Sequence, residues 1–115
     1  MNRYFRNVSK AIDIIRKAAG GDMETQGIAI LFAVMSRDPD PLLVKDLMNM
    51  VGVSHGSTIR YLRLLGSDDN HPRGGECLGF LQSTQDSSDK RRKLVTLSAK
   101  GRRLRAELNG VLGRD

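Results

Sequence analysis

The sequence has very few of the residues that build disulfides and metal sites. Among its 115 residues, Cys77 is the one cysteine, and His55 and His71 are the two histidines. A single cysteine cannot form an internal disulfide, and these three side chains are too few to complete a structural zinc site. The composition therefore indicates a fold that depends on neither a disulfide framework nor a metal ion.

Long apolar runs and catalytic motifs are missing too. The chain has no tryptophan, and aromatic residues make up 4% of it. No stretch approaches the run of about 18 apolar residues that spans a membrane, and no basic-then-apolar leader is present. Gly74-Gly75 lacks the lysine of a phosphate-binding loop, and there is no nucleophile elbow. We therefore expect an intracellular, cytoplasmic protein, associated with the nucleoid if it is bacterial or phage-encoded, with no membrane contact, enzymatic activity or cofactor.

Positive charge is abundant and lies in one segment. The formal net charge is +6, and residues 85–105 hold eight of the 19 Lys and Arg but two of the 13 Asp and Glu, so the other residues carry eleven of each sign. Clustered cations repel one another unless a polyanion binds them. Nucleic acid is a better candidate than an acidic membrane, because no predicted helix combines a strongly basic polar face with bulky aromatics.

The spacing of apolar residues predicts helices on both sides of this segment. Phe5, Val8, Ile12 and Ile15 recur at intervals of three and four, and residues 25–35 are so densely apolar that they must be buried. Because residues before proline avoid the helical region, Asp38-Pro39-Asp40-Pro41 is a rigid break. The expected helices span residues 2–19, 24–36, 44–51, 54–65 and 98–112.

Two of these helices have the spacing of a helix-turn-helix. Residues 44–51 end at Gly52, which suits the left-handed position that closes a helix, and Ser54 is a good N-cap for residues 54–65. About three residues separate the two helices, as in DNA-binding helix-turn-helix motifs. The same pattern is compatible with an ordinary small helical hairpin.

A hairpin with a basic tip is expected after the second of these helices. Residues 66–78 form a loop rich in glycine and acidic residues, and alternating residues predict strands at 79–84 and 93–97. The wing, residues 79–97, thus places Lys90-Arg91-Arg92-Lys93 at its turn. The predicted fold class is mainly α with a small β-hairpin wing (α+β), a winged helix-turn-helix that forms a single domain over residues 1–115.

The hairpin resembles the wing of the MarR (multiple antibiotic resistance regulator) family. The matching positions are Asp89, Arg91, Val95, Leu97, Ser98 and Gly101, together with Gly79-Phe80-Leu81 at the first wing strand and KDLMNMVGV at residues 45–53. The resemblance covers residues 43–65 and 79–103, and it implies a winged helix that binds DNA. Unlike typical members, this chain has an insert at residues 66–78 and short ends, which disfavour a pocket for a small-molecule effector.

The predicted DNA-binding residues lie on the second helix of the pair and on the wing. If Thr58, Leu62 and Leu65 face the core, the outer arc presents polar and cationic side chains to base edges and phosphates. Arg91 is expected in the minor groove, where the resemblance also places it, with Asp89 either orienting it or forming the turn. The full predicted set is Ser54, His55, Ser57, Ile59, Arg60 and Arg63 on the helix, and Lys90, Arg91, Arg92 and Lys93 on the wing.

Two functions remain open at this stage. The first is a sequence-specific regulator of transcription that binds double-stranded DNA, with helix 54–65 in the major groove and the basic wing, residues 86–93, in the minor groove. A homodimer would form through the terminal helices, using Phe5, Val8, Ile12, Ile15, Leu104, Leu108, Val111 and Leu112. The alternative is a winged helix that binds a protein in a transcription or other nucleoprotein complex, which the acidic insert with Asp68, Asp69 and Glu76 favours.

Overall fold

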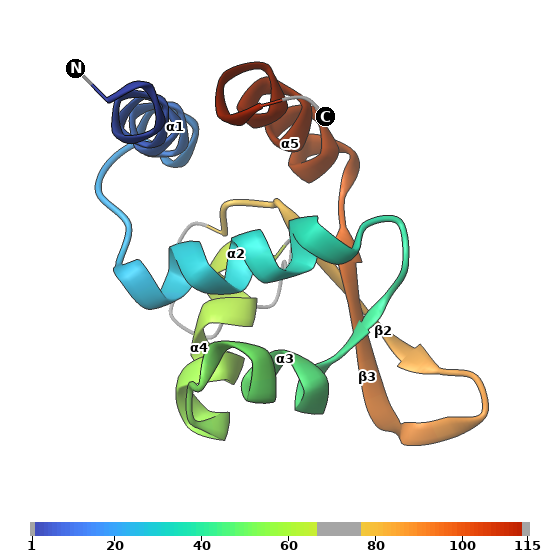
Figure 1. Ribbon diagram of the computed structural model, residues 1–115. Coiled ribbons are helices and arrows are strands. Elements are labelled where there is room, and N and C mark those ends of the chain that lie inside the picture. The colour runs from blue at the N-terminus through green and yellow to red at the C-terminus, as the bar shows by residue number, and fades with distance from the viewer. Residues whose placement is uncertain (1, 67–76, 114–115) are drawn as a thin grey trace.

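A computed structural model describes residues 2–66 and 77–113 of the chain. In this part, helices pack against one another and against a small antiparallel sheet whose hairpin projects from the helical body (Figure 1). The predicted fold class is therefore confirmed. The elements in chain order are α1 (Arg3–Ala19), α2 (Thr25–Arg37), β1 (Leu42–Leu43), α3 (Val44–Val51), α4 (His55–Leu65), β2 (Leu81–Asp86), β3 (Asp89–Leu97) and α5 (Ala99–Leu112).

The helix ends follow the local signals in the sequence. The backbone of Gly52 is left-handed, with a φ of 73°, and its N–H donates to the carbonyl of Met48 as α3 ends. The hydroxyl of Ser54 accepts a hydrogen bond from the Ser57 N–H, so Ser54 is the N-cap of α4. Both predictions for the helix-turn-helix are confirmed. In contrast, α2 begins and ends one residue later than the predicted 24–36, because Glu24 is its N-cap.

The core is centred on α2, as the density of apolar residues predicted. Ile30 and Leu31 are fully buried on this helix, and Tyr61 of α4 and Phe80 before β2 pack into the same cluster. At one end of the molecule α1 packs along α5, and both chain termini lie there (Figure 1). The hairpin projects at the opposite end, so α1 and α5 lie at one end of the molecule and the wing at the other (Figure 1).

The sheet contains a strand that the sequence did not indicate. Leu42 and Leu43 form β1, which pairs antiparallel with Val95 and Leu94 of β3 and gives the strand order β1-β3-β2. A strand of two residues has no periodicity that a sequence pattern could detect. It joins the start of α3 to the wing and so connects the helix-turn-helix to the hairpin.

The predicted first wing strand, residues 79–84, was placed two residues too early. Gly79 has a φ of 77°, which is outside the extended region, and β2 begins at Leu81 and continues to Asp86. The backbone at this point is tied to the end of α4 instead: the Gly79 N–H donates to Gly66 O at 2.9 Å and the Phe80 N–H to Leu65 O at 2.7 Å. These bonds compete with strand pairing for the same backbone groups.

The four adjacent cations do not form the turn of the hairpin, which corrects another expectation. Strand β3 begins at Asp89 rather than at Lys93, and Asp86 pairs with Asp89 across a turn made of Ser87 and Ser88. The Asp86 carboxylate closes this turn by accepting from both the N–H and the hydroxyl of Ser88. The cations therefore lie in a strand, where successive side chains point to opposite faces.

Most of the predicted loop at 66–78 lies outside the described residues.

Candidate nucleic-acid interface

Helix α4 is held with one face in the core and the opposite face in solvent. Thr58, Tyr61, Leu62 and Leu65 are buried, and the Thr58 hydroxyl donates to Ser54 O at 2.8 Å, so no polar group on this face is left unpaired. The inward residues predicted from the sequence are therefore the buried ones. Tyr61, which the sequence pattern did not place inside, belongs to the same face.

The predicted contact residues of α4 lie on its outward side, but they differ in exposure. His55, Arg60 and Arg63 are exposed, whereas Ser57 and Ile59 are partly buried. Ser54 is exposed and also serves as the cap of the helix. The cationic side chains are thus available to a ligand along the helix, and Ile59 presents an apolar surface between them and the wing.

On the wing, Arg91 is held by its neighbour Asp89. The carboxylate of Asp89 accepts from the Arg91 backbone N–H at 3.0 Å, from Nε at 3.2 Å and from Nη2 at 3.4 Å. The Arg91 side chain is nevertheless 91% exposed, so it projects from the hairpin into solvent. The side chain of Asp89 thus bonds Arg91, whereas the turn residue Ser88 is bonded by Asp86.

The acidic residues of the hairpin neutralise part of its positive charge. Asp86 lies 3.9 Å from Arg92 Nε, in addition to its bonds with Ser88. Hydrogen bonds from Ser88 lower the pKa of Asp86, and hydrogen bonds from Arg91 lower the pKa of Asp89. Both carboxylates are therefore ionised near neutral pH. Lys93 is exposed, and the side chain of Lys90 lies outside the described residues.

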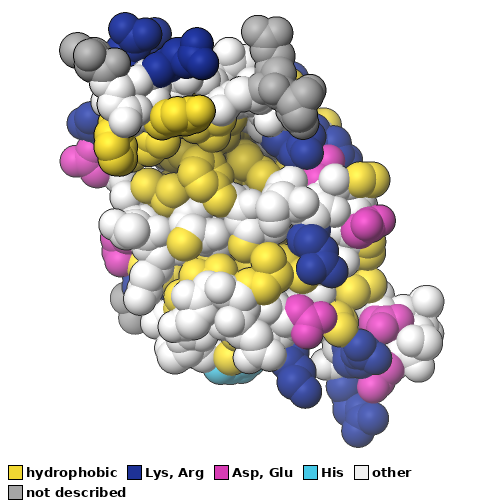
Figure 2. Space-filling model, viewed as in Figure 1, with side chains coloured by type: hydrophobic (Ala, Val, Ile, Leu, Met, Phe, Trp, Pro, Cys, Tyr) yellow, Lys and Arg dark blue, Asp and Glu magenta, His cyan; other side chains and the backbone are white. Residues whose placement is uncertain are grey.

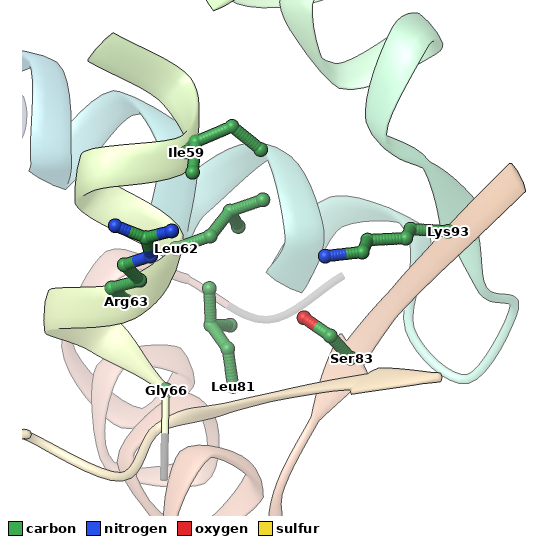
Figure 3. Close-up of a pocket in the computed structure, with 7 residues that line it drawn as sticks. All are labelled: Ile59, Leu62, Arg63, Gly66, Leu81, Ser83 and Lys93. Carbon is green, nitrogen blue, oxygen red and sulfur yellow. The ribbon is translucent and has the colours of Figure 1, made fainter. Parts of the chain in front are cut away.

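A cleft separates α4 from the wing (Figure 3). It has a volume of about 400 Å³. In Figure 3, Arg63 extends from α4 and the Lys93 amine reaches in from β3 on the other side, with Ser83 below it on β2. Its lining residues are Ile59, Leu62, Arg63, Gly66, Leu81, Ser83 and Lys93.

A second, larger cleft of about 840 Å³ lies between the helix-turn-helix and β3. It brings His55 and Ile59 of α4 together with Arg91, Arg92 and Lys93 of the wing. Its remaining lining residues are Leu43, Val44, Lys45 and Met48. Lys45 was not among the predicted contact residues, although its exposed position at the start of α3 was a usable signal. Residues from both predicted elements therefore line one surface, which we call the basic face: His55, Ile59, Arg63, Arg91, Arg92 and Lys93.

Arg60 has partners inside the molecule that the sequence did not indicate. Its Nη1 lies 3.4 Å from Glu24 Oε1, its Nη2 donates to Tyr61 Oη at 3.2 Å, and its guanidinium stacks 4.5 Å from the centre of the Tyr61 ring. The Tyr61 hydroxyl in turn donates to the other oxygen of Glu24. The hydrogen bond from Tyr61, and after it the one from Arg60, lowers the pKa of Glu24, and the hydrogen bond to Glu24 raises the pKa of Tyr61. No short-range sequence pattern reveals this contact, because Glu24 and Arg60 are far apart in the chain.

Other kinds of site find no support in the described residues. Within residues 2–66 and 77–113, no group of three or more His, Cys, Asp and Glu side chains is arranged to hold a metal ion. No helix in the same part of the chain has the length and apolar character needed to cross a membrane.

Comparison with known proteins identifies the fold through structure rather than sequence. No model of a protein family matches the chain, and no curated protein sequence does. Among solved structures, the PcaV transcriptional regulator from Streptomyces coelicolor is 23% identical, with a TM-score of 0.57 over 78% of this chain and 55% of its own. The S. aureus MepR-DNA complex is 16% identical, with a TM-score of 0.64 over 92% of this chain and 73% of the other.

MarR from E. coli is similar as well. It is 19% identical, with a TM-score of 0.59 over 96% of this chain and 74% of its own. At such low identities the comparison establishes the architecture: the protein has a MarR-like winged helix fold. The chain matches just over half the length of PcaV. The wing resemblance seen in the sequence is thus confirmed as a resemblance of fold.

Proposed function

We propose that the protein is a sequence-specific regulator of transcription that binds double-stranded DNA through its basic face and through Arg60, an exposed cation of α4 outside the two clefts. The observation that carries this proposal is that the cations of the wing and the outward side of α4 line the same surface, with a cleft between them. MepR, whose structure in a DNA complex shares this fold, supports the same assignment. In this proposal the protein acts in the cytoplasm, on DNA of the nucleoid if it is bacterial or phage-encoded, and catalyses no reaction.

Each element has a proposed role that follows from its geometry. Helix α4 enters the major groove, where arginine bonds both acceptors of a guanine edge, and Arg60 and Arg63 are the candidates for this contact. Arg91, projecting from the hairpin and held by Asp89, enters the adjacent minor groove. The proposed phosphate contacts come from Ser54, His55, Ser57, Lys90, Arg92 and Lys93, with Ile59 against the groove floor.

The proposed active form is a homodimer that joins through α1 and α5. Tyr4 and Phe5 are each 75% exposed, and Val8, Ile12 and Leu112 are between 39% and 46% exposed, which is unusual for large apolar side chains in water. Figure 2 shows hydrophobic side chains gathered between the two helices. Part of the predicted dimer surface is excluded, however, because Ile15, Leu104 and Leu108 are buried in the core of the monomer.

The experiment that tests DNA binding is a measurement of duplex affinity over a range of salt concentrations. Each phosphate that a protein cation neutralises contributes about −0.9 to the slope of log K against log salt, so a basic face predicts a steep decline. Selection of bound sites from random duplex DNA then tests specificity, and a dimer should yield an inverted repeat. Salt-insensitive or undetectable duplex binding would overturn the proposal.

The second candidate function, a module that binds a protein, has one structural observation in its favour. The larger cleft contains Leu43, Val44 and Met48, an apolar floor beneath the cations that an acidic protein with apolar anchors would fit. Replacing Arg60 and Arg91 with alanine separates the two functions. Loss of duplex binding supports the DNA regulator, whereas retained binding of a protein partner supports the module.

A further inference from the structure

Glu24 occupies the N-cap position of α2 but does not cap that helix. Its side chain makes no hydrogen bond to the first turn of α2 and instead reaches Arg60 and Tyr61 on α4. We propose that Glu24 and Tyr61 are positioning residues that hold Arg60 in the orientation with which it discriminates a base pair. This inference rests on the proposed function and deepens it, because it assigns a part in sequence preference to residues that are not proposed to contact a base.

Tyr61 provides a rigid platform for the guanidinium of Arg60. The tyrosine is fully buried, and a Cβ placed on Gly27 of α2 would lie 3.2 Å from Tyr61 Cδ1, so the glycine leaves room for the ring against α2. The hydroxyl of Tyr61 is bonded to Glu24, which fixes the ring at its other end. The guanidinium of Arg60, 4.5 Å from the centre of this ring, therefore stacks on a side chain that is itself held in place by packing.

The contacts leave Arg60 able to bind a further partner. A guanidinium has five N–H donors, and within the described residues Arg60 uses Nη1 toward Glu24 and Nη2 toward Tyr61. The side chain is 59% exposed, so its remaining donors reach solvent. Because these contacts restrict the rotamers of a long side chain before DNA arrives, less conformational entropy is lost when the base contact forms.

Glu24 has two opposite effects on DNA binding, and they are separable. As an anion near the duplex it weakens binding to every sequence equally, through repulsion of the phosphates. As the partner of Arg60 it strengthens the preference for one base pair over another. The ratio of affinities for two duplexes that differ at one base pair cancels the first effect and reports the second.

The test begins with sites selected from random duplex DNA by the wild-type protein. The Arg60→Ala variant then identifies the base pair whose preference it loses, by roughly 5- to 150-fold, the ratio that corresponds to about 1–3 kcal/mol per base contact. We expect Glu24→Ala to reduce the preference at that same base pair by at least about twofold, the low end of coupling between residues in contact. In an Arg60→Ala background, removing Glu24 should have no further effect on the ratio.

Two further variants keep the result interpretable. Glu24→Gln retains an acceptor for the Tyr61 hydroxyl while losing the charge, so it is the variant to use if Glu24→Ala does not fold; its preference should lie between those of wild type and Glu24→Ala. Asp22→Asn removes a neighbouring charge, 85% exposed and paired with Arg16, and should change the affinity for all duplexes alike. Preference at the base pair that depends on Arg63 should survive every Glu24 variant.

The possible failures are distinguishable. If the wild-type protein selects a site and Arg60→Ala loses a base preference while folded Glu24→Ala and Glu24→Gln both keep it, the inference is overturned and the proposed function stands. If Arg60→Ala changes no base preference, Arg60 is not a specificity residue and the inference is overturned as well. If the wild-type protein binds no duplex, the proposed function fails and the inference falls with it.

Discussion

The backbone of Gly101 on α5 lies against the carbonyl oxygen of Phe80, so close that a Cβ at Gly101 would come within 2.1 Å of that oxygen. This contact sets the distance between α5 and the backbone at Phe80, just before β2. Ser98, the N-cap of α5, reinforces it: its hydroxyl donates to Gly79 O at 2.5 Å and accepts from the Gly101 N–H at 3.0 Å. Gly101, one of the positions that match the wing in the sequence analysis, is thus required by its close packing against Phe80.

Gly101→Ala should destabilise the fold, because the new methyl group collides with backbone that cannot rotate away. We expect a loss of about 1–3 kcal/mol in the free energy of unfolding, or more if the backbone at Phe80 must shift. Urea denaturation measures it. Gly110→Ala on the same helix is the matched control: a Cβ there meets no atom within 4 Å. That variant should gain about 0.5–1 kcal/mol through helix propensity, and equal losses in both variants would refute the packing argument.

Arg91→Ala should weaken duplex binding and reduce its salt dependence. A cation in the minor groove also displaces counterions from the duplex, so its loss lowers the magnitude of the slope of log K against log salt by up to about 0.9. Fluorescence anisotropy at several salt concentrations measures the slope. Lys17→Ala, which removes one positive charge from α1 at the far end of the molecule, should leave the slope near the wild-type value. Equal slopes for Arg91→Ala and wild type would exclude Arg91 from the interface.

Val8→Asp should convert the proposed homodimer into a monomer. Val8 is 46% exposed on the apolar side of α1, and a carboxylate there would be desolvated in a dimer interface without a partner. Sedimentation analysis or light scattering gives the molecular mass. Ser9→Asp, at the next, exposed position, introduces the same charge and should preserve the assembly. A Val8→Asp protein that remains dimeric would show that the dimer forms elsewhere, and a monomeric wild-type protein would refute the proposed dimer.

The turn of the hairpin should open in acid. Hydrogen bonds in the folded state lower the pKa values of Asp86 and Asp89 below their ordinary value of 3.8. Their contribution to stability is therefore fully present above that value and is lost as pH falls through the lowered folded-state pKa values. Backbone NMR signals of Ser88 and Arg91, whose N–H groups donate to these carboxylates, should report the change. In Asp86→Asn the Ser88 signal should no longer titrate in this range.

Removing the Glu24 carboxylate should lower the pKa of Tyr61. The hydrogen bond to Glu24 is the main cause that raises the Tyr61 pKa above its ordinary value of 10.0, because it stabilises the protonated phenol. Since the folded-state pKa is raised, the associated stability is present below 10.0 and is lost as pH rises through the folded-state value. In a Tyr4→Phe background, Tyr61 is the one remaining tyrosine of the two in the chain, and its absorbance can be titrated alone. An unchanged titration in Glu24→Ala, which removes the acceptor altogether, would contradict the contact between Glu24 and Tyr61.

Local sequence signals predicted the helix-turn-helix well because they act within a few residues. Gly52 can adopt a left-handed backbone without a steric penalty, and Ser54 can bond the N–H three residues ahead, so each marks a helix end from its own chemistry. The inward face of α4 followed from the same kind of reasoning. The register of the hairpin was not predicted, because β3 pairs with β2 and also with β1, which is distant in the sequence.

The candidate interface required longer-range information. The sequence located the cations at positions 90–93 and the outward side of α4. It did not reveal that β1, which directly precedes α3, pairs with β3 and so connects the helix-turn-helix to the wing. It also did not reveal that Glu24 meets Arg60, since the contact joins residues that lie 36 positions apart. Such contacts depend on how α2 and α4 pack, which no local pattern encodes.

By itself, the sequence determined where helices begin and end, where positive charge accumulates, and that a winged helix accounts for both, because each of these depends on properties of neighbouring residues. Tertiary structure alone decided which apolar side chains remain for a partner: Ile15 of α1 and Leu104 of α5 are buried in the core, while Phe5 and Val8 are left exposed. It also decided which cations share a surface. Packing depends on contacts between residues that are far apart in the sequence, so it is established only when the whole chain is folded.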